Sequence, residues 1–483
     1  MAEAEKVSAH SAQRHLSPGS LPAQRHLSPA FSRAEAPVPG LSPRSEAPVP
    51  GAQSQTRPGA EPGLNQSQDQ RTRTRTKTRS SRTRTRTRTM WLMVLLCSVA
   101  PLTAAPMSKH HSGAGRMWHI TDLHLDPTFH LDPDPAHVCS SSKGAAALAP
   151  GPFGDYLCDA PYRLLLSALD TLGRMVKEDD FVIWTGDSPP HVPPAELSTD
   201  LVIQILANLT LTIQDKLPKV QVFPAVGNHD YWPQDQMPDS PNDIYSAAAR
   251  LWSPWLQEGA LQTFVKGGFY SQLLRPGLRI VSLNTILYYG PNAATLNSSD
   301  PAGQFQWLQG TLEGAERNQE QVYVIAHVPV GFLPFVRNTT AMRREHNERL
   351  SAMFVRFSHV IKGQFYGHTH RDSLMVLRDQ SGPVAVLPEP DRSQLQQRAQ
   401  WRLEYVLTEA FALKDLSPAS LLSLASDLLP PSSKAFLTYF NHFNVEFNPR
   451  LSCEGRCKVD QVCAVLNVAQ SGYERCLGLQ GHG

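Results

Sequence analysis

Val222-Phe-Pro-Ala-Val-Gly-Asn-His-Asp230 is the stretch of sequence that decides the fold. Its apolar half contains β-branched and aromatic residues and ends in a turn signal, which is typical of a buried strand in a parallel sheet. Gly227 permits a sharp turn, and open α/β sheets bind ligands at the carboxyl ends of such strands. Alone, Gly-Asn-His-Asp is more often only a turn. Its meaning depends on four other apolar runs that end in a similar way.

Apolar runs alternate with amphipathic stretches from Trp118 onward. We expect strands at 117–123, 181–184, 222–226, 278–284, 322–326 and 360–365, and helices at 162–176, 197–213, 305–316 and 342–357. This alternation predicts an α/β sandwich with a largely parallel central sheet. Shorter strands are expected at 373–377 and 384–387, before a polar stretch at 389–400. From Trp401 the chain is mostly helical, and helices at 421–429, 435–440 and 459–468 would form a small disulfide-tied cap.

Five strand ends carry side chains that can bind a metal ion. These residues are Asp122, His124, Asp187, Asn228, His327, His368 and His370. We expect all of them at the same edge of one sheet. Carboxylate, imidazole and amide ligands without a thiolate suit zinc, manganese or iron. Seven ligands suit two ions that share a carboxylate, and a pair about 3.5–4 Å apart can bind a phosphoryl group and supply a bridging hydroxide as nucleophile.

Each of these residues also has a simpler interpretation. His327 alone would more often be a hydrogen-bonded core histidine, Asp187 could cap the next segment, and His368 with His370 could form a solvated turn. These interpretations would have to hold together at five strand ends in order along the chain. We therefore favour the metal site.

Residues 1–89 do not resemble a folded domain. They hold 15 Lys and Arg against 6 Asp and Glu, two copies each of Ala-Gln-Arg-His-Leu-Ser-Pro and Glu-Ala-Pro-Val-Pro-Gly, and Arg-Thr repeats up to Thr89. With almost no apolar residues, this leader is expected to be disordered. The arginine run could indicate a nuclear or nucleic-acid-binding arm. We favour a solvated tail, or sequence upstream of the true start, and expect no nucleic-acid partner.

Residues 90–105, Met-Trp-Leu-Met-Val-Leu-Leu-Cys-Ser-Val-Ala-Pro-Leu-Thr-Ala-Ala, predict a cleavable secretory signal. The apolar core is too short to span a bilayer and is followed by small residues. Met90 is therefore a credible initiator. No other apolar run is long enough for a membrane span, and residues 477–483 lack the hydrophobic tail of a lipid-anchor signal. We expect a secreted or lysosomal protein.

Cysteine usage agrees with export. Cys97 lies inside the signal, and the remaining cysteines are Cys139, Cys158, Cys453, Cys457, Cys463 and Cys476. An even number in an exported chain implies disulfides. The C-terminal four could bind zinc, but no histidine follows at zinc-finger spacing, so disulfides are favoured. Glycosylation sequons begin at Asn208, Asn297 and Asn338, with another at Asn65 in the leader, and are used only if the chain is exported.

The sequence motifs resemble those of a known enzyme family. Asp122-x-His124, Gly186-Asp187, Gly227-Asn-His-Asp230, Ala326-His327 and Gly367-His-x-His370 are similar to the five motifs of the calcineurin-like metallophosphoesterases. Three longer strings, at 184–192, 227–235 and 363–372, resemble the acid sphingomyelinase-like phosphodiesterases, most closely those of type 3a. The match covers roughly residues 118–386 and 401–476.

This resemblance implies a fold and a set of residue roles. The fold is a two-sheet sandwich flanked by helices over residues 116–390, with a small helical, disulfide-tied subdomain over 401–478. Two Zn²⁺ ions are implied, the first bound by Asp122, His124 and His370, the second by Asn228, His327 and His368, with Asp187 as the bridge. His191 and His229 would contact the phosphate, together with Asn228, and protonate the leaving oxygen.

The implied activity is that of a secreted, monomeric phosphodiesterase acting on nucleotides such as ATP, nucleoside diphosphates and CDP-choline-like pyrophosphates. The alternatives are a catalytically impaired secreted isoform that only binds ligands or partners, and a sphingomyelin-type lipid phosphodiesterase. The leader has no counterpart in the family, and family strands between 387 and 401 are absent here. We expect an incomplete sheet after residue 387, and lower stability because an apolar face and a strand edge lose their cover.

The predicted signal gives a first test. The mature N-terminus should lie near Pro106, because the small residues before it suit the signal peptidase. N-terminal sequencing of secreted protein should find none of the Arg-Thr repeat. Residues 1–89 on exported material would contradict this prediction.

Overall fold

The computed structural model describes residues 116–333, 339–378, 383–386, 401, 403–445 and 451–480. The leader, the predicted signal, Asn338 and the polar stretch 389–400 lie outside these residues. In the part of the chain that is described, no helix is both long enough and apolar enough to cross a membrane.

The first sheet contains three parallel strands in the order β1 (Met117–Ile120), β2 (Phe181–Trp184) and β3 (Gln221–Pro224). All four residues of β2 are buried, which explains why this strand is a continuous apolar run. Helices α2 (Tyr162–Met175) and α3 (Thr199–Lys216) connect the strands, and both match predicted helices.

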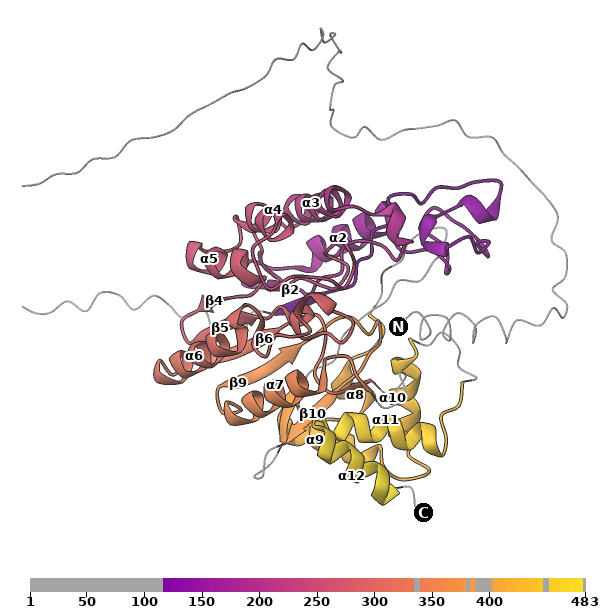
Figure 1. Cartoon of the computed structure of the whole chain (residues 1–483). Coiled ribbons are helices and arrows are strands. Elements are labelled where there is room, and N and C mark those ends of the chain that lie inside the picture. Colours follow the sequence, from indigo (N-terminus) through magenta and orange to yellow (C-terminus); the bar gives the residue numbers. More distant parts are fainter. Residues whose placement is uncertain are drawn as a thin grey trace, which may run out of the picture. The chain divides into compact units, whose positions relative to one another are not determined.

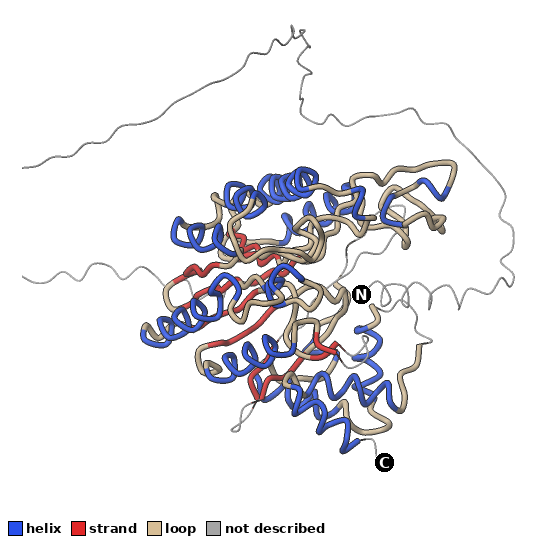
Figure 2. The backbone as a smooth tube through the Cα atoms, in the orientation of Figure 1, coloured by secondary structure: helices blue, strands red, loops and turns tan. Residues whose placement is uncertain are grey.

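A second sheet contains β4 (Tyr270–Arg275), β5 (Leu278–Ser282), β6 (Gln321–Ile325) and β9 (Ile361–Phe365) in this order. Strands β5, β6 and β9 run parallel, and β4 pairs with β5 in an antiparallel hairpin. Helices α6 (Gln304–Arg317) and α7 (Arg344–Arg356) make the parallel crossovers. Figure 2 shows the strands lying between the helices.

The two-sheet α/β fold is confirmed, but the expectation that all the strand ends share one sheet is wrong. The hydroxyls of Tyr270 and Ser282 donate to the carbonyl oxygen of Pro224, at 2.8 and 3.4 Å. Pro224 has no N–H to offer to a backbone ladder. Among the described residues β3 and β5 form no hydrogen-bonded strand pair, and the two sheets meet here through these side-chain hydrogen bonds.

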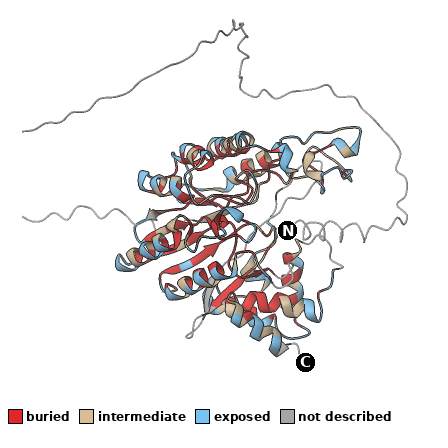
Figure 3. Cartoon of the chain, viewed as in Figure 1, coloured by how far each residue is buried: buried red, intermediate tan, exposed pale blue. Residues whose placement is uncertain are grey.

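Helices α4 (Asp243–Trp252) and α5 (Glu258–Gly267) are not predicted from the sequence, nor are β4, β7 (Phe332–Leu333) and β8 (Thr339–Thr340). The ring of Trp252 on α4 lies 6.0 Å from that of Trp184 on β2 and 5.1 Å from that of Phe264 on α5, measured between centroids. These helices therefore cover the first sheet. Figure 1 shows α2 to α5 on one side of the strands, and Figure 3 shows buried residues concentrated in the strands that lie between the helices.

The C-terminal part combines a hairpin with helices. Strands β10 (Met375–Arg378) and β11 (Pro383–Val386) pair antiparallel. The helices are α8 (Leu407–Ala410), α9 (Pro418–Asp427), α10 (Lys434–Phe443), α11 (Arg456–Leu466) and α12 (Gln470–Gln480). Val376 packs in one apolar cluster with residues of α9, α10 and α11.

The predicted disulfides are confirmed. Cys139 pairs with Cys158, Cys453 with Cys457, and Cys463 with Cys476. The third bridge ties α11 to α12, so the C-terminal helices are held by covalent links as well as by packing.

Asp180 offers a test of the first sheet. Its carboxylate is 3% exposed and accepts hydrogen bonds from the backbone N–H groups of Arg116 and Lys177 and from Trp118 Nε1, at 2.8, 3.0 and 2.9 Å. Burial opposes ionisation, but these donors lower the pKa of Asp180 below its usual value. Asp180→Ala should reduce the free energy of unfolding by about 1–3 kcal/mol, since it leaves buried donors unpaired.

Because the pKa is lowered in the folded state, this contribution is present above about pH 4 and is lost as the pH falls below it. Thermal melts from pH 7 downward should therefore show the variant and wild type converging in acid. Asp179→Ala, at the exposed neighbour, is the control and should melt like wild type. Equal melting of all three proteins at pH 7 would contradict the role of Asp180.

Candidate active site

The structure brings all seven predicted ligands together where the two sheets meet. Asp122, His124, Asp187 and Asn228 follow strands of the first sheet, and His327, His368 and His370 follow strands of the second. His124 Nε2 lies 3.0 Å from His370 Nε2, and His370 Nε2 lies 3.1 Å from Asp122 Oδ1. Asn228 Oδ1 lies 3.0 Å from both His327 Nε2 and His368 Nδ1.

The potential ligand atoms form three overlapping groups: one is His124, His191 and His370, and the other two share one carboxylate. Asp122, His124, Asp187 and His370 offer atoms within 4.8 Å of one another, and so do Asp187, His327 and His368. Asp187 Oδ2 lies 3.0 Å from His327 Nε2 and 3.6 Å from His124 Nε2. Asp187 is the one residue that belongs to both of these groups.

The backbone around these residues is strained. Asp122, His124, Asp187, His368 and His370 have φ angles of 52°, 38°, 58°, 79° and 52°. Residues other than glycine rarely adopt this left-handed region, and such strain concentrates at functional sites. Gly227 and Gly367 allow the motif loops to pass closely, because a Cβ at either position would collide with the side chain of Asp187 or Asp122.

Hydrogen bonds outside the cluster orient two of the histidines. His124 Nδ1 lies 2.8 Å from the carbonyl oxygen of Pro189, and His327 Nδ1 lies 2.8 Å from that of Thr185. A carbonyl only accepts, so each Nδ1 carries the proton. Each Nε2 then faces the cluster, which is how imidazole ligands of metal ions are usually held.

The electrostatics of the cluster suit cations. Burial opposes the charge on Asp187, but His327 and His229 hold its pKa well below the usual range, and histidines do the same for Asp122. Despite burial, the carboxylates raise the pKa of His124 to about 10 and that of His327 to about 9. Protonated histidines thus balance the buried carboxylates, and a divalent cation can replace those protons. The donor set therefore fits metal ions.

The two predicted catalytic histidines lie beside the cluster. The ring of His191 is 4.1 Å from that of His124 and 4.3 Å from that of His229, between centroids. His229 is buried, and its Nε2 lies 3.0 Å from the side-chain amide nitrogen of Gln234. Its Nδ1 has no hydrogen-bond partner among the described residues. Burial lowers the pKa of both histidines.

Sequence reasoning missed several residues that support the site. Asp230 accepts hydrogen bonds from the backbone N–H groups of Gly227, Asp187 and Ser188, at 2.7, 2.9 and 2.9 Å, and so holds two motif loops together. Asp235 Oδ1 accepts from Asn228 Nδ2 at 2.9 Å, which turns the amide oxygen of Asn228 toward the cluster. Both aspartates stand in or just after the Gly-Asn-His-Asp motif, the only signal of their roles in the sequence.

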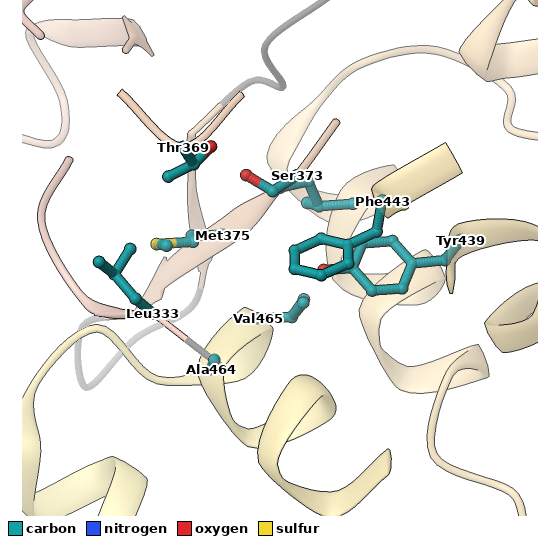
Figure 4. Close-up of a pocket in the computed structure, with 9 residues that line it drawn as sticks. Leu333, Thr369, Ser373, Met375, Tyr439, Phe443, Ala464 and Val465 are labelled. Carbon is teal, nitrogen blue, oxygen red and sulfur yellow. The ribbon is translucent and has the colours of Figure 1, made fainter. Parts of the chain in front are cut away.

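Other predicted residues lie outside the cluster. Asn208, on α3, and Asn297 are exposed, as a glycosylation site requires. Figure 4 shows a small pocket lined by Thr369, Met375, Tyr439 and Phe443 among others. Thr369 lies between His368 and His370, but the lining is mainly apolar, and none of the seven predicted ligands belongs to it.

Comparisons with known proteins agree with this geometry. The calcineurin-like phosphoesterase model matches residues 115–372, and the model of the acid sphingomyelin phosphodiesterase C-terminal region matches 386–482. The chain is 49% identical to the cyclic GMP-AMP phosphodiesterase SMPDL3A of Rattus norvegicus, over 78% of this chain and 94% of the relative. It is 36% identical to the acid sphingomyelinase-like phosphodiesterase 3b of Mus musculus, over 77% and 92%.

The chain belongs to the calcineurin-like phosphoesterases, within the branch of the acid sphingomyelinase-like phosphodiesterases. It is a metal-dependent hydrolase of phosphoric ester bonds. The alignment with the rat relative spans 423 positions, whereas 78% of this 483-residue chain is about 377 residues. This chain therefore lacks a counterpart to about 46 aligned positions, the difference between the two lengths.

Asp235 provides a test of how the ligands are held. Asp235→Ala should weaken metal binding by about 10- to 100-fold, the usual cost of losing a group that orients a ligand. The affinity can be measured by competition with a chromophoric chelator. Asp235→Asn is the matched control, since an amide oxygen can still accept from Asn228 and asparagine tolerates the φ of 68° at this position. Equal metal affinity in all three proteins would refute the role of Asp235.

Proposed function

We propose that this chain is an exported two-zinc phosphodiesterase that hydrolyses phosphodiester and phosphoanhydride bonds of nucleotides. The observation that carries the proposal is the Asp187 carboxylate, which belongs to two of the three groups of potential ligand atoms and links them. Relatives that are 48–49% identical are named cyclic GMP-AMP phosphodiesterases, which favours a nucleotide over a lipid as substrate.

In this proposal Asp122, His124 and His370 hold one ion, Asn228, His327 and His368 hold the other, and Asp187 bridges them. When bound, the ions would polarise the phosphoryl oxygen and supply a nucleophile from water. The geometry that supports this assignment is the pair of contacts from Asp187 Oδ2, at 3.0 Å to His327 and 3.6 Å to His124.

The remaining work falls to the protein's own residues. His191 and His229 lie on the cluster with their rings 4.3 Å apart, and with Asn228 they would contact the substrate phosphate. Hydrolysis needs a proton for the departing oxygen, and a positioned histidine supplies it. In the structure the Gln234 amide nitrogen donates to His229 Nε2, so His229 would have to take up a proton at Nε2 and exchange that amide for the leaving oxygen before it acts as the acid.

Export rests on the predicted signal and is supported by the three disulfides, which persist in oxidising compartments. Glycans would attach at Asn208, Asn297 and Asn338. We further propose a monomer with a metallophosphoesterase domain at 116–390 and a C-terminal subdomain at 401–478. The expected loss of stability from the short stretch after residue 387 remains a prediction.

One assay panel distinguishes the three candidate functions: a nucleotide phosphodiesterase, a lipid phosphodiesterase and a binding protein without turnover. Purified secreted protein, loaded with zinc, should hydrolyse a cyclic dinucleotide, ATP or CDP-choline faster than sphingomyelin in mixed micelles. Faster hydrolysis of sphingomyelin would favour the lipid phosphodiesterase. Tight nucleotide binding without turnover of any substrate would favour the isoform that acts only as a binding protein.

If Asp187 bridges the two ions, its replacement should cause the loss of both bound metal and turnover. Asp187→Asn removes the one charge that both ions would share, so the purified variant should lose bound metal and turnover together. Metal content by plasma emission spectroscopy and hydrolysis of a nucleotide check this. A variant that keeps two ions and near-normal turnover would refute the assignment.

His229→Ala should behave differently. The metal should stay, while turnover falls by about 10²–10⁴-fold, the usual effect of a lost general acid. Bis(p-nitrophenyl) phosphate, whose leaving group needs no proton, should be partly spared. If turnover of both substrates falls equally, His229 positions the phosphate instead of protonating the leaving group.

A further inference from the structure

One carboxylate outside the predicted ligand set binds a predicted catalytic histidine. Asp159 Oδ2 accepts the backbone N–H of His191 at 2.5 Å, and the two carboxylate oxygens lie 3.2 and 3.1 Å from His191 Nδ1. We propose that Asp159 is a positioning residue that fixes the tautomer and orientation of His191, and that the Cys139–Cys158 disulfide loop holds Asp159 in place for this role. This inference rests on the role of His191 in the proposed function.

The tautomer follows from the chemistry of the pair. An ionised carboxylate only accepts hydrogen bonds, so Nδ1 of His191 must carry a proton and donate it to Asp159. Nε2 is then the nitrogen left for the substrate. Around the ring lie His124, His229 and His370, at centroid distances of 4.1, 4.3 and 5.5 Å. The Asp159 carboxylate accepts hydrogen bonds from both the backbone N–H and the ring of His191, which limits rotation of the His191 side chain.

The chain around Asp159 is tied down on both sides. Cys158, directly before it, is bonded to Cys139 across 19 residues. The backbone N–H of Asp159 donates to Ser141 Oγ at 2.8 Å, and Ser141 Oγ donates in turn to Asp126 Oδ2 at 2.6 Å. Ala160, directly after Asp159, forms a parallel bridge with Leu125, next to the predicted ligand His124.

These contacts connect the disulfide loop to the cluster by a continuous path. Ser141 lies two residues after Cys139, and Leu125 lies one residue after His124. Without the disulfide, the two ends of the loop would no longer be linked covalently, and Asp159 would be held less firmly beside His191. Nδ1 of His191 would then lose its acceptor. Among the described residues, Asp159 is the one side chain that forms a hydrogen bond with the His191 ring.

The test is a double-mutant cycle, because Asp159 is proposed to act only through His191. Wild type, Asp159→Asn, His191→Ala and the double variant are loaded with zinc. Two quantities are measured, the kcat for bis(p-nitrophenyl) phosphate and the dissociation constant of inorganic phosphate by calorimetry. Phosphate binding needs no turnover, so the cycle can be completed even if the proposed nucleotide activity fails.

Asp159→Asn should lower kcat by about 10- to 100-fold, the usual effect of removing a carboxylate behind a functional histidine, and should weaken phosphate binding. In the His191→Ala background the same change should have no further effect on either quantity. Zinc content should stay at the wild-type level. Losses that multiply in the double variant would show a merely structural role, and His191→Ala with unchanged kcat and phosphate affinity would also overturn the proposal.

Three further variants separate position in the loop from contact with His191. Leu148→Ala lies between Cys139 and Cys158, is 61% exposed and is not a hydrogen-bond partner of His191, so it should match wild type. Ser141→Ala removes the acceptor of the Asp159 N–H and should shift kcat in the same direction as Asp159→Asn. Replacing Cys139 and Cys158 by serine should do likewise, and full activity in both the serine and the Ser141 variants would overturn the role of the loop.

Discussion

The whole site depends on where the Asp187 carboxylate is held. The backbone N–H of Asp187 donates to Asp230, and Asp187 Oδ1 accepts the backbone N–H of His229 at 2.8 Å. With Oδ1 occupied, Oδ2 faces His327 and His124, one from each ligand group. Two buried carboxylates surrounded by histidines would be costly without compensating positive charge. Protonated histidines can provide that charge, and metal ions can replace those protons.

This arrangement requires two loops to approach more closely than side chains normally allow. Glycines at 186, 227 and 367 permit the approach, and the ligands next to them take up left-handed backbone conformations. Strain of this kind persists only where the surroundings impose it. Here the strain is imposed by the parallel strands that precede the loops and by the Asp230 carboxylate, which accepts hydrogen bonds from both loops. The same loops place His191 and His229 beside the cluster, so the proposed metal site and the proposed substrate contacts share one scaffold.

The strand ends and the potential ligands beside them could be predicted from the sequence because buried parallel strands are apolar runs, and the polar residues within a few positions after each run lie at the binding edge. Asp187 after Phe181–Trp184 is an example. The division into two sheets could not be predicted, because periodicity does not say which strands pair. Helix α4 was missed after a proline-rich stretch that reads as loop. Asp159 and Asp235 act through contacts in space, and no local pattern in the chain reveals them.

The most direct measurement of the central claim is an anomalous-difference map at the zinc absorption edge, from crystals of the secreted protein. The account predicts two peaks, one on each side of the Asp187 carboxylate, the first beside Asp122 and His370 and the second beside Asn228 and His368. A single peak, or no peak at Asp187 in protein supplied with zinc, would contradict it.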